Sequence, residues 1–362
     1  MRSYGLILPG GGAKGAYQIG AWSALREMRI KFSAIAGVSI GSINGALIAS
    51  NRYEQALEMW NTVRIEHGVN ITEELKEPDN LFSVKNYAAL FKEIMRNGGI
   101  DASPTKDFLS QYIDEAAVRK SKIPLGLITY QLSTMNPLEL FTQDFPEGEL
   151  IDYILASSKV PGVSKIGPEG EMFIDGGVYD NIPFSVLKKR GINNLIIIDI
   201  SVMKGWKHQT DAYSCSQIVN IRPYNSDELG AAFDFSPEMA TKRMTMGYLD
   251  AKKAFGKLQG NIYHFLPRTF SALLKKYGPE TLYQLEQLAF NMGLERIKIY
   301  KADEFINAVF ELYQQKEAER EEKEGNEENK GFLGTIVKKW TDIVNTKSDF
   351  PLADELLEAM KK

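Results

Sequence analysis

The chain has 362 residues, and its 43 Lys and Arg residues against 47 Asp and Glu residues give a formal net charge of −4. A hydrophobic fraction of 44% excludes a chain that is disordered throughout, and the acidic balance argues against the broad basic surface that nucleic-acid binding requires. Cys215 is the single cysteine, so an intramolecular disulfide is excluded and a cysteine-based metal site is not expected.

The first fifty residues predict the opening of a parallel α/β sheet. A short apolar run at residues 4–8 predicts a buried strand, and the glycines that follow it lead into a helix over residues 13–29. A second strand is predicted at residues 31–36, followed by a glycine-flanked turn and a small-residue helix at 42–50. Strand, turn, helix repeated in this order is typical of α/β folds.

The rest of the chain continues this pattern and then becomes helical. Residues 52–120 are expected to be mostly helical. Strands are expected at 123–135, 138–142, 171–174, 194–200 and 218–222, with a helix at 149–159. We therefore predict an α/β fold, with a mainly parallel central sheet between helical layers and a helical C-terminal extension.

Composition suggests four parts. We expect an α/β domain at residues 1–235 with a helical insertion at 52–120, and a helical part at 236–315. A charged linker at 316–330 has no apolar face, and amphipathic helices are expected at 331–362.

A serine stands in the turn after the second predicted strand, within Gly37-Val-Ser39-Ile-Gly41. A sharp strand-to-helix turn exposes a serine hydroxyl, and glycines on either side leave room for the tight backbone. The motif alone often marks an ordinary glycine-rich loop. Here the strand before it and the helix after it favour Ser39 as a nucleophile.

The glycine-rich segment Gly10-Gly11-Gly12-Ala13-Lys14-Gly15 lies at the end of the first predicted strand. A dinucleotide site would need an acidic residue at the end of the second strand, and a P-loop would need Ser or Thr after the lysine; both are missing. The consecutive amides at a helix start are better suited to bind the oxyanion that forms when a carbonyl is attacked.

A base is also needed. None of the three histidines lies in a recognisable motif. Asp175-Gly176-Gly177 directly follows the strand predicted at 171–174; although Asp-Gly alone usually marks a turn, its position at a strand end favours Asp175 as the base.

Together these three motifs resemble those of the patatin-like phospholipase family: GGGAKG at Gly10–Gly15, GVSIG at Gly37–Gly41 and DGG at Asp175–Gly177. The flanking segments 156–161 and 179–183 also resemble the family, and the likeness covers roughly residues 4–200.

The resemblance implies a patatin-like three-layer fold and a Ser-Asp dyad that works without histidine, metal or cofactor. Ser39 would be the nucleophile and Asp175 the base. Amides around Gly10, Gly11, Gly12 and Ala13 would form the oxyanion hole. The remaining motif glycines, which would shape the turns, are Gly15, Gly37, Gly41, Gly176 and Gly177.

The implied substrate is an acyl ester of a phospholipid or lysophospholipid, so a peripheral membrane contact is considered. Lys14 could attract a lipid phosphate, although pairing with a nearby carboxylate is slightly favoured. The amphipathic segment 331–345 could touch a membrane, but docking on protein is the commoner role of such a stripe; the apolar segment 80–97 could border an acyl channel, with core packing again favoured. With no signal peptide or transmembrane stretch predicted, a cytoplasmic location is expected.

We therefore expect a serine lipid acyl hydrolase. The alternatives are an esterase or lipase acting on other acyl esters, a non-catalytic lipid-binding regulatory protein, and a nucleotide-binding protein that uses the glycine loop. A Ser-His-Asp triad, in which His208 or His264 follows Asp175, is the mechanistic alternative. Nothing in the sequence indicates head-group preference or oligomeric state.

Overall fold

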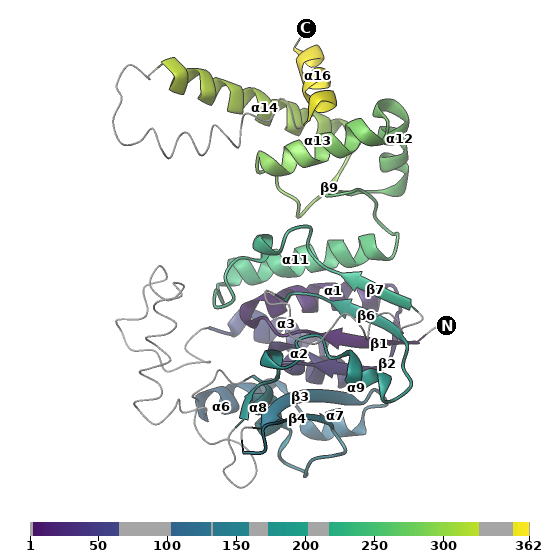
Figure 1. Cartoon of the computed structure of the whole chain (residues 1–362), viewed down its shortest axis with the longest axis vertical. Coiled ribbons are helices and arrows are strands. Elements are labelled where there is room, and N and C mark those ends of the chain that lie inside the picture. Colours follow the sequence, from purple (N-terminus) through teal and green to yellow (C-terminus); the bar gives the residue numbers. More distant parts are fainter. Residues whose placement is uncertain are drawn as a thin grey trace. The chain divides into compact units, whose positions relative to one another are not determined.

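The computed structural model describes residues 3–64, 103–131, 133–158, 173–201, 217–325 and 350–361. The chain divides into two compact units, Met1–Ala254 and Phe255–Lys362 (Figure 1). The predicted segments 80–97 and 331–345, together with His67 and His208, lie outside the described residues.

The first unit is built on a seven-stranded sheet with the strand order β4-β3-β2-β1-β6-β7, in which β5 also pairs with β3. The five strands from β3 to β7 along this order run parallel, while β4 and β5 are antiparallel to β3. The predicted mainly parallel α/β fold is confirmed. The strands are β1 Ser3–Leu8, β2 Lys31–Gly37, β3 Leu125–Gln131, β4 Asn136–Phe141, β5 Phe173–Asp175, β6 Asn194–Ile198 and β7 Gln217–Ile221.

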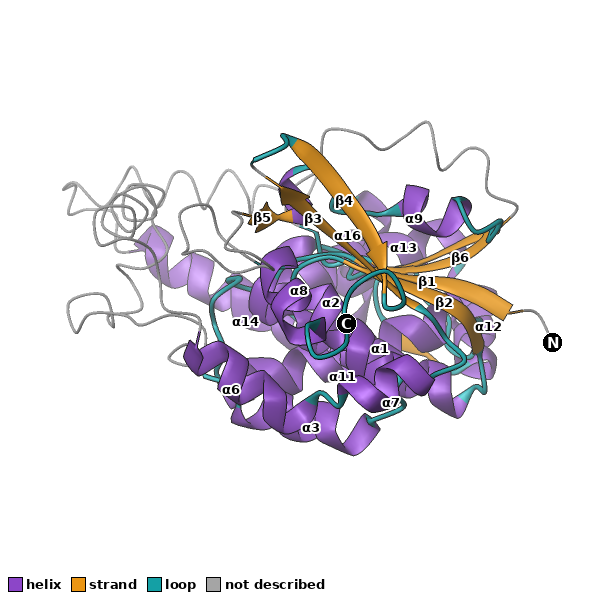
Figure 2. Cartoon of the chain, turned by 90° about the horizontal axis from the view of Figure 1, so that it is seen from below, coloured by secondary structure: helices purple, strands orange, loops and turns teal. Residues whose placement is uncertain are grey.

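Helices connect these strands and flank the sheet (Figure 2). The described helices of this unit are η1 Gly12–Gly15, α1 Ala16–Glu27, α2 Ile40–Ala49, α3 Tyr53–Thr62, α6 Ser103–Tyr112, α7 Glu115–Lys120, α8 Leu150–Ser157, η5 Gly176–Val178, α9 Phe184–Lys188, η6 Ser226–Leu229 and α11 Pro237–Ala254.

Both faces of the central strands are covered. Ile7 of β1 belongs to an apolar cluster with Phe184 and Leu187 of α9. The neighbouring Leu8 approaches α2, where a Cβ on Gly45 would lie 3.7 Å from its Cδ1. Because consecutive side chains of a strand point to opposite faces, a strand covered on both sides reads as a continuous apolar run, which is the pattern at residues 4–8.

Helix α11 packs closely on α1. A Cβ on Gly20 would lie 1.8 Å from the Met244 carbonyl oxygen, and one on Gly247 would lie 2.1 Å from the Tyr17 carbonyl oxygen. The two glycines therefore let the helix backbones approach each other closely. The sequence analysis assigned residues 237–254 to a separate helical part, whereas in the structure this helix completes the first unit.

The second unit is mostly helical and has a core of its own. An aromatic cluster of Tyr263, Phe265, Tyr300 and Phe305 lies at its centre. Its described elements are β8 His264–Phe265, α12 Pro267–Tyr277, α13 Pro279–Asn291, β9 Ile299–Tyr300, α14 Ala302–Gly325 and α16 Pro351–Met360. Helix α14 includes the first part of the charged stretch 316–330. Within the described ranges, no helix combines the length and apolar character needed to cross a bilayer.

Candidate active site

Ser39 lies in a strained turn between β2 and α2. Its backbone has φ 54° and ψ −128°, and a positive φ is uncommon for a residue with a side chain. A Cβ on Gly37 would lie 2.5 Å from the Gly41 carbonyl oxygen, and one on Gly41 would lie 1.9 Å from the Leu8 carbonyl oxygen. Glycine is therefore required on both sides of Ser39, whose side chain is left half-exposed.

Buried Ser157, the last residue of α8, supports this turn. Its Oγ accepts a hydrogen bond from the Ser39 amide at 3.1 Å and donates one to the Ile128 carbonyl oxygen at 2.6 Å. The Ser42 hydroxyl donates to the Ser39 carbonyl oxygen at 2.6 Å. The sequence alone does not predict this role for Ser157, because Ser157 and Ser39 are 118 residues apart.

Asp175 ends strand β5, and the sheet topology brings it to Ser39. Asp175 pairs with Thr129 of β3, and β3 lies beside β2, the strand that leads into Ser39. One carboxylate oxygen accepts the Gly177 amide at 2.7 Å, and the Ser39 side chain lies close enough for its hydrogen bonding to favour the ionised carboxylate. Burial raises the pKa of Asp175 to about 6, although these two hydrogen bonds act in the opposite direction.

Residues 10–13 follow β1 and turn into η1. The Gly10 amide donates to Asn181 Oδ1 at 2.9 Å, and the Ala13 amide donates to the Ala232 carbonyl oxygen at 2.7 Å. Within the described part of the chain, the amides of Gly11 and Gly12 have no acceptor. Of the four donors expected from the sequence, only these two are therefore available to a ligand.

Asn181 joins two of the motifs. Besides accepting from the Gly10 amide, it donates from Nδ2 to the Gly10 carbonyl oxygen at 3.4 Å. A Cβ on Gly10 would lie 2.9 Å from both Asn181 Oδ1 and the Ser39 Cβ, and one on Gly177 would lie 2.9 Å from Asn181 Oδ1 and 3.0 Å from Asp175 Oδ1. The three glycine-rich motifs thus meet in a volume that excludes additional side chains.

Lys14 is buried, with 5% of its surface exposed. Burial and the positive charge of Arg243 lower the pKa of Lys14, while Asp227 acts to raise it. No ion pair joins Lys14 to a carboxylate among the residues placed in the structure. Lys14 therefore places a positive charge beside the glycine loop.

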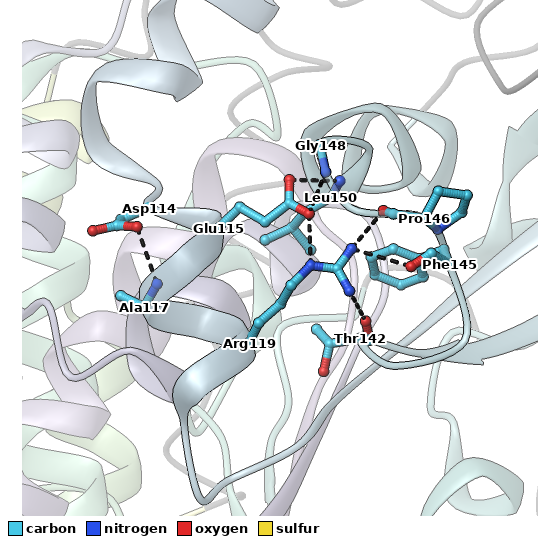
Figure 3. Close-up of polar contacts among 9 residues, drawn as sticks. All are labelled: Asp114, Glu115, Ala117, Arg119, Thr142, Phe145, Pro146, Gly148 and Leu150. Carbon is cyan, nitrogen blue, oxygen red and sulfur yellow. Dashed lines mark hydrogen bonds and ion pairs between the residues drawn. The ribbon is translucent and has the colours of Figure 1, made fainter.

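A partly buried network holds the loop that precedes α8 (Figure 3). Arg119 of α7 donates to the carbonyl oxygens of Thr142 and Phe145 at 2.6 and 3.1 Å. Glu115, paired with Arg119 at 2.7 Å, accepts the Leu150 amide at 3.2 Å. This pair fixes the start of α8, the helix that carries Ser157.

The structure describes one of the three histidines, His264. His264 belongs to the second unit, where it is fully buried and its Nδ1 contacts the Arg296 carbonyl oxygen at 3.0 Å. No group of three or more His, Cys, Asp or Glu side chains suited to a metal ion occurs in the part of the chain that the structure describes.

The model of the patatin-like phospholipase family matches residues 6–188, which include Ser39, Asp175 and the glycine loop. The chain belongs to this family. Patatin-like phospholipases are lipid acyl hydrolases. All three glycine-rich motifs, at residues 10–15, 37–41 and 175–177, lie inside the matched region.

Two curated proteins are similar to this chain. The lysophospholipase NTE1 of Candida glabrata is 26% identical over 204 residues, which are 55% of this chain and 10% of that protein. Patatin-like phospholipase domain-containing protein 7 of Rattus norvegicus is 27% identical over 212 residues, 57% of this chain and 14% of that protein. The chain thus spans only a small part of the length of these relatives.

A solved structure is also similar. VipD from Legionella pneumophila aligns with a TM-score of 0.40 and 13% identity, covering 99% of this chain and 85% of that one.

Proposed function

We propose that this patatin-like protein hydrolyses carboxylic ester bonds of phospholipids or lysophospholipids through Ser39 and Asp175. The observation that carries the proposal is the convergence of Ser39, Asp175 and the glycine loop around Asn181. Ser39 and Asp175 come from strand ends 136 residues apart in the sequence. A serine in a strained turn beside a carboxylate of raised pKa is the arrangement that a two-residue nucleophile and base require.

In the first half of the reaction, the Ser39 hydroxyl attacks the ester carbonyl carbon while its proton passes to the Asp175 carboxylate. Raising the pKa of Asp175 toward 6 makes it a stronger base than a free aspartate. The negative carbonyl oxygen is stabilised by the Gly11 and Gly12 amides. When the tetrahedral intermediate collapses, Asp175 returns its proton to the leaving alcohol, and the acyl group remains on Ser39.

In the second half, a water molecule attacks the acyl-serine and gives its proton to Asp175. The same two amides stabilise the second tetrahedral intermediate. Its collapse releases the fatty acid, and the proton held by Asp175 returns to Ser39. Every proton in this cycle is carried by Asp175, so the chemistry needs no histidine.

The choice of a phospholipid or lysophospholipid rests on the family and on its curated members, one of which is named a lysophospholipase. Lys14 offers a positive charge near the glycine loop that could favour a phosphorylated lipid, although its burial limits direct contact. A membrane contact through residues 331–345 and a cytoplasmic location remain proposals from the sequence.

The test compares wild type with Ser39→Ala on a mixed lipid extract, with the products identified by mass spectrometry. We expect free fatty acids and the matching deacylated phospholipids from wild type only. Release of fatty acids from neutral lipids alone would indicate an esterase or lipase instead. Absence of products, together with failure of a fluorophosphonate probe to label Ser39, would indicate a lipid-binding protein without turnover.

A further inference from the structure

Arg243 of α11 is a fully buried arginine that contacts the glycine loop directly. One nitrogen, Nη1, donates to the Ala13 carbonyl oxygen at 3.2 Å. The acceptors that the structure gives for Arg243 are all main-chain carbonyl oxygens, not carboxylates. A guanidinium group is well suited to bind several carbonyl oxygens at once, because its N–H donors have fixed relative directions.

The other donors of Arg243 organise the segment between η6 and α11. They reach the carbonyl oxygens of Leu229 at 2.7 Å, Ala231 at 2.8 Å and Asp234 at 2.6 Å. Arg243 therefore gathers residues 229–234 around one side chain. An irregular segment with few regular backbone bonds of its own gains a defined shape in this way.

This segment in turn holds the glycine loop. Within it, the Ala232 carbonyl oxygen accepts the Ala13 amide at 2.7 Å. The same oxygen lies against Gly12, because a Cβ on Gly12 would come within 2.3 Å of it. Gly12 also has φ +58°, a conformation that residues with a Cβ rarely adopt. Arg243 thus contacts the loop both through Ala13 and through Ala232.

We propose that Arg243 is the positioning residue of the oxyanion loop: it holds the Gly11 and Gly12 amides in the orientation that meets the developing oxyanion. The inference rests on the proposed function. Arg243 does not touch the substrate and acts through the backbone that carries the two donors. Its charge, next to that of Lys14, also adds positive potential where negative charge develops.

The test measures hydrolysis of p-nitrophenyl butyrate by Arg243→Gln and Arg243→Lys, per active site titrated to completion with a fluorophosphonate. Titration removes any contribution from unfolded protein. We expect kcat to fall by about a hundredfold in Arg243→Gln, the cost typical of a reacting group displaced by about 1 Å, with KM within about twofold. Arg243→Lys keeps the positive charge but loses the forked donor geometry, and its kcat should fall about tenfold.

A trifluoromethyl ketone separates positioning from a merely structural role. It forms a tetrahedral adduct with the serine whose oxygen occupies the oxyanion hole, so its inhibition constant should rise in parallel with the loss of kcat/KM. Loss of folded protein alone would leave that constant unchanged. Arg296→Gln is the matched control: Arg296 is a buried arginine of the second unit that donates to the Ile262 carbonyl oxygen at 2.6 Å, and its loss should leave kcat per labelled site unchanged.

If Arg243→Gln does not fold, Gly12→Ala disturbs the contact between the loop and the Ala232 carbonyl oxygen from the loop side. Its kcat/KM should fall and its inhibition constant for the ketone should rise in parallel. Near-wild-type kcat in Arg243→Gln or Arg243→Lys, or a reduced kcat with an unchanged ketone constant, would overturn the inference. Absence of hydrolysis and labelling in wild type would instead count against the proposed function, so the two failures are distinguishable.

Discussion

Replacing Asp175 with asparagine should abolish turnover and at the same time stabilise the fold at neutral pH. Asparagine has nearly the same shape as aspartate and can still accept from the Gly177 amide, but it cannot take the Ser39 proton. It also removes a carboxylate that burial makes costly to ionise. Loss of activity accompanied by a gain in stability is the pattern expected when a site residue is tuned for chemistry.

The size of the gain follows from the pKa of Asp175, which rises from 3.8 to about 6. A shift of about two units corresponds to about 3 kcal/mol of unfolding free energy. Because Asp175 is mostly buried but keeps some contact with solvent, solvent screening reduces this figure, and we expect about 1–2 kcal/mol.

The direction of the change in stability with pH follows from proton binding. Between pH 3.8 and about 6 the folded state binds more protons at Asp175 than the unfolded state, so wild type loses stability as the pH rises through this window. The advantage of Asp175→Asn should therefore be small near pH 4, grow up to about pH 6 and stay constant above pH 7.

Urea unfolding of both proteins from pH 4 to 8, followed by tryptophan fluorescence, measures this difference; Trp22 and Trp60 are buried in the first unit. Glu27→Gln provides a control of opposite sign, because hydrogen bonds from Lys252 and Tyr248 lower the pKa of Glu27, so this variant should become less stable than wild type as the pH rises. Retained turnover in Asp175→Asn would remove Asp175 from the mechanism. A stability difference that does not change with pH would refute the argument from burial.

Three further predictions concern the site. The acylation rate of wild type should rise with pH and level off above an apparent pKa of about 6, because only ionised Asp175 can accept the Ser39 proton. Stopped-flow kinetics with a p-nitrophenyl ester would measure this rate, and a rate that does not change with pH would contradict the prediction. Ser157→Ala removes the acceptor of the Ser39 amide and should reduce kcat about tenfold with a small loss of thermal stability, since a buried donor left unsatisfied costs about 1–3 kcal/mol. Gly41→Ala should prevent labelling of Ser39 by a fluorophosphonate, because its Cβ would lie 1.9 Å from a backbone oxygen. Gly148→Ala is the control, since Gly148 has φ +90° but open space around it, and it tests the cost of a strained backbone conformation alone. Equal labelling of the two variants would refute the steric argument.

The sequence predicted the local elements well where a periodic pattern and a glycine boundary coincide. The strand at residues 4–8 and the glycine-flanked turn around Ser39 could be predicted because their determinants lie within a few residues of one another. The sequence predicted a helix over residues 237–254 but not its packing on α1, because Gly20 and Gly247, which allow the close approach, look like ordinary helix glycines until the two helices are seen together.

The supporting residues of the site could not be found from local patterns. Ser157, Asn181 and Arg243 are 118, 171 and 230 residues away in sequence from the groups they bind, and none carries a motif that indicates its partner. The glycine loop shows the same limit: the sequence offers consecutive amides, but hydrogen bonds to distant acceptors use those of Gly10 and Ala13.

The sequence alone therefore determined the fold class, the strained serine turn, the candidate base and the family resemblance, because backbone sterics and hydrophobic periodicity act over short stretches of chain. The tertiary structure decided that Asp175 reaches Ser39, that its pKa rises and that Gly11 and Gly12 keep their amides available. These properties depend on burial and on hydrogen bonds between strand ends and loops, which exist only after the sheet has assembled.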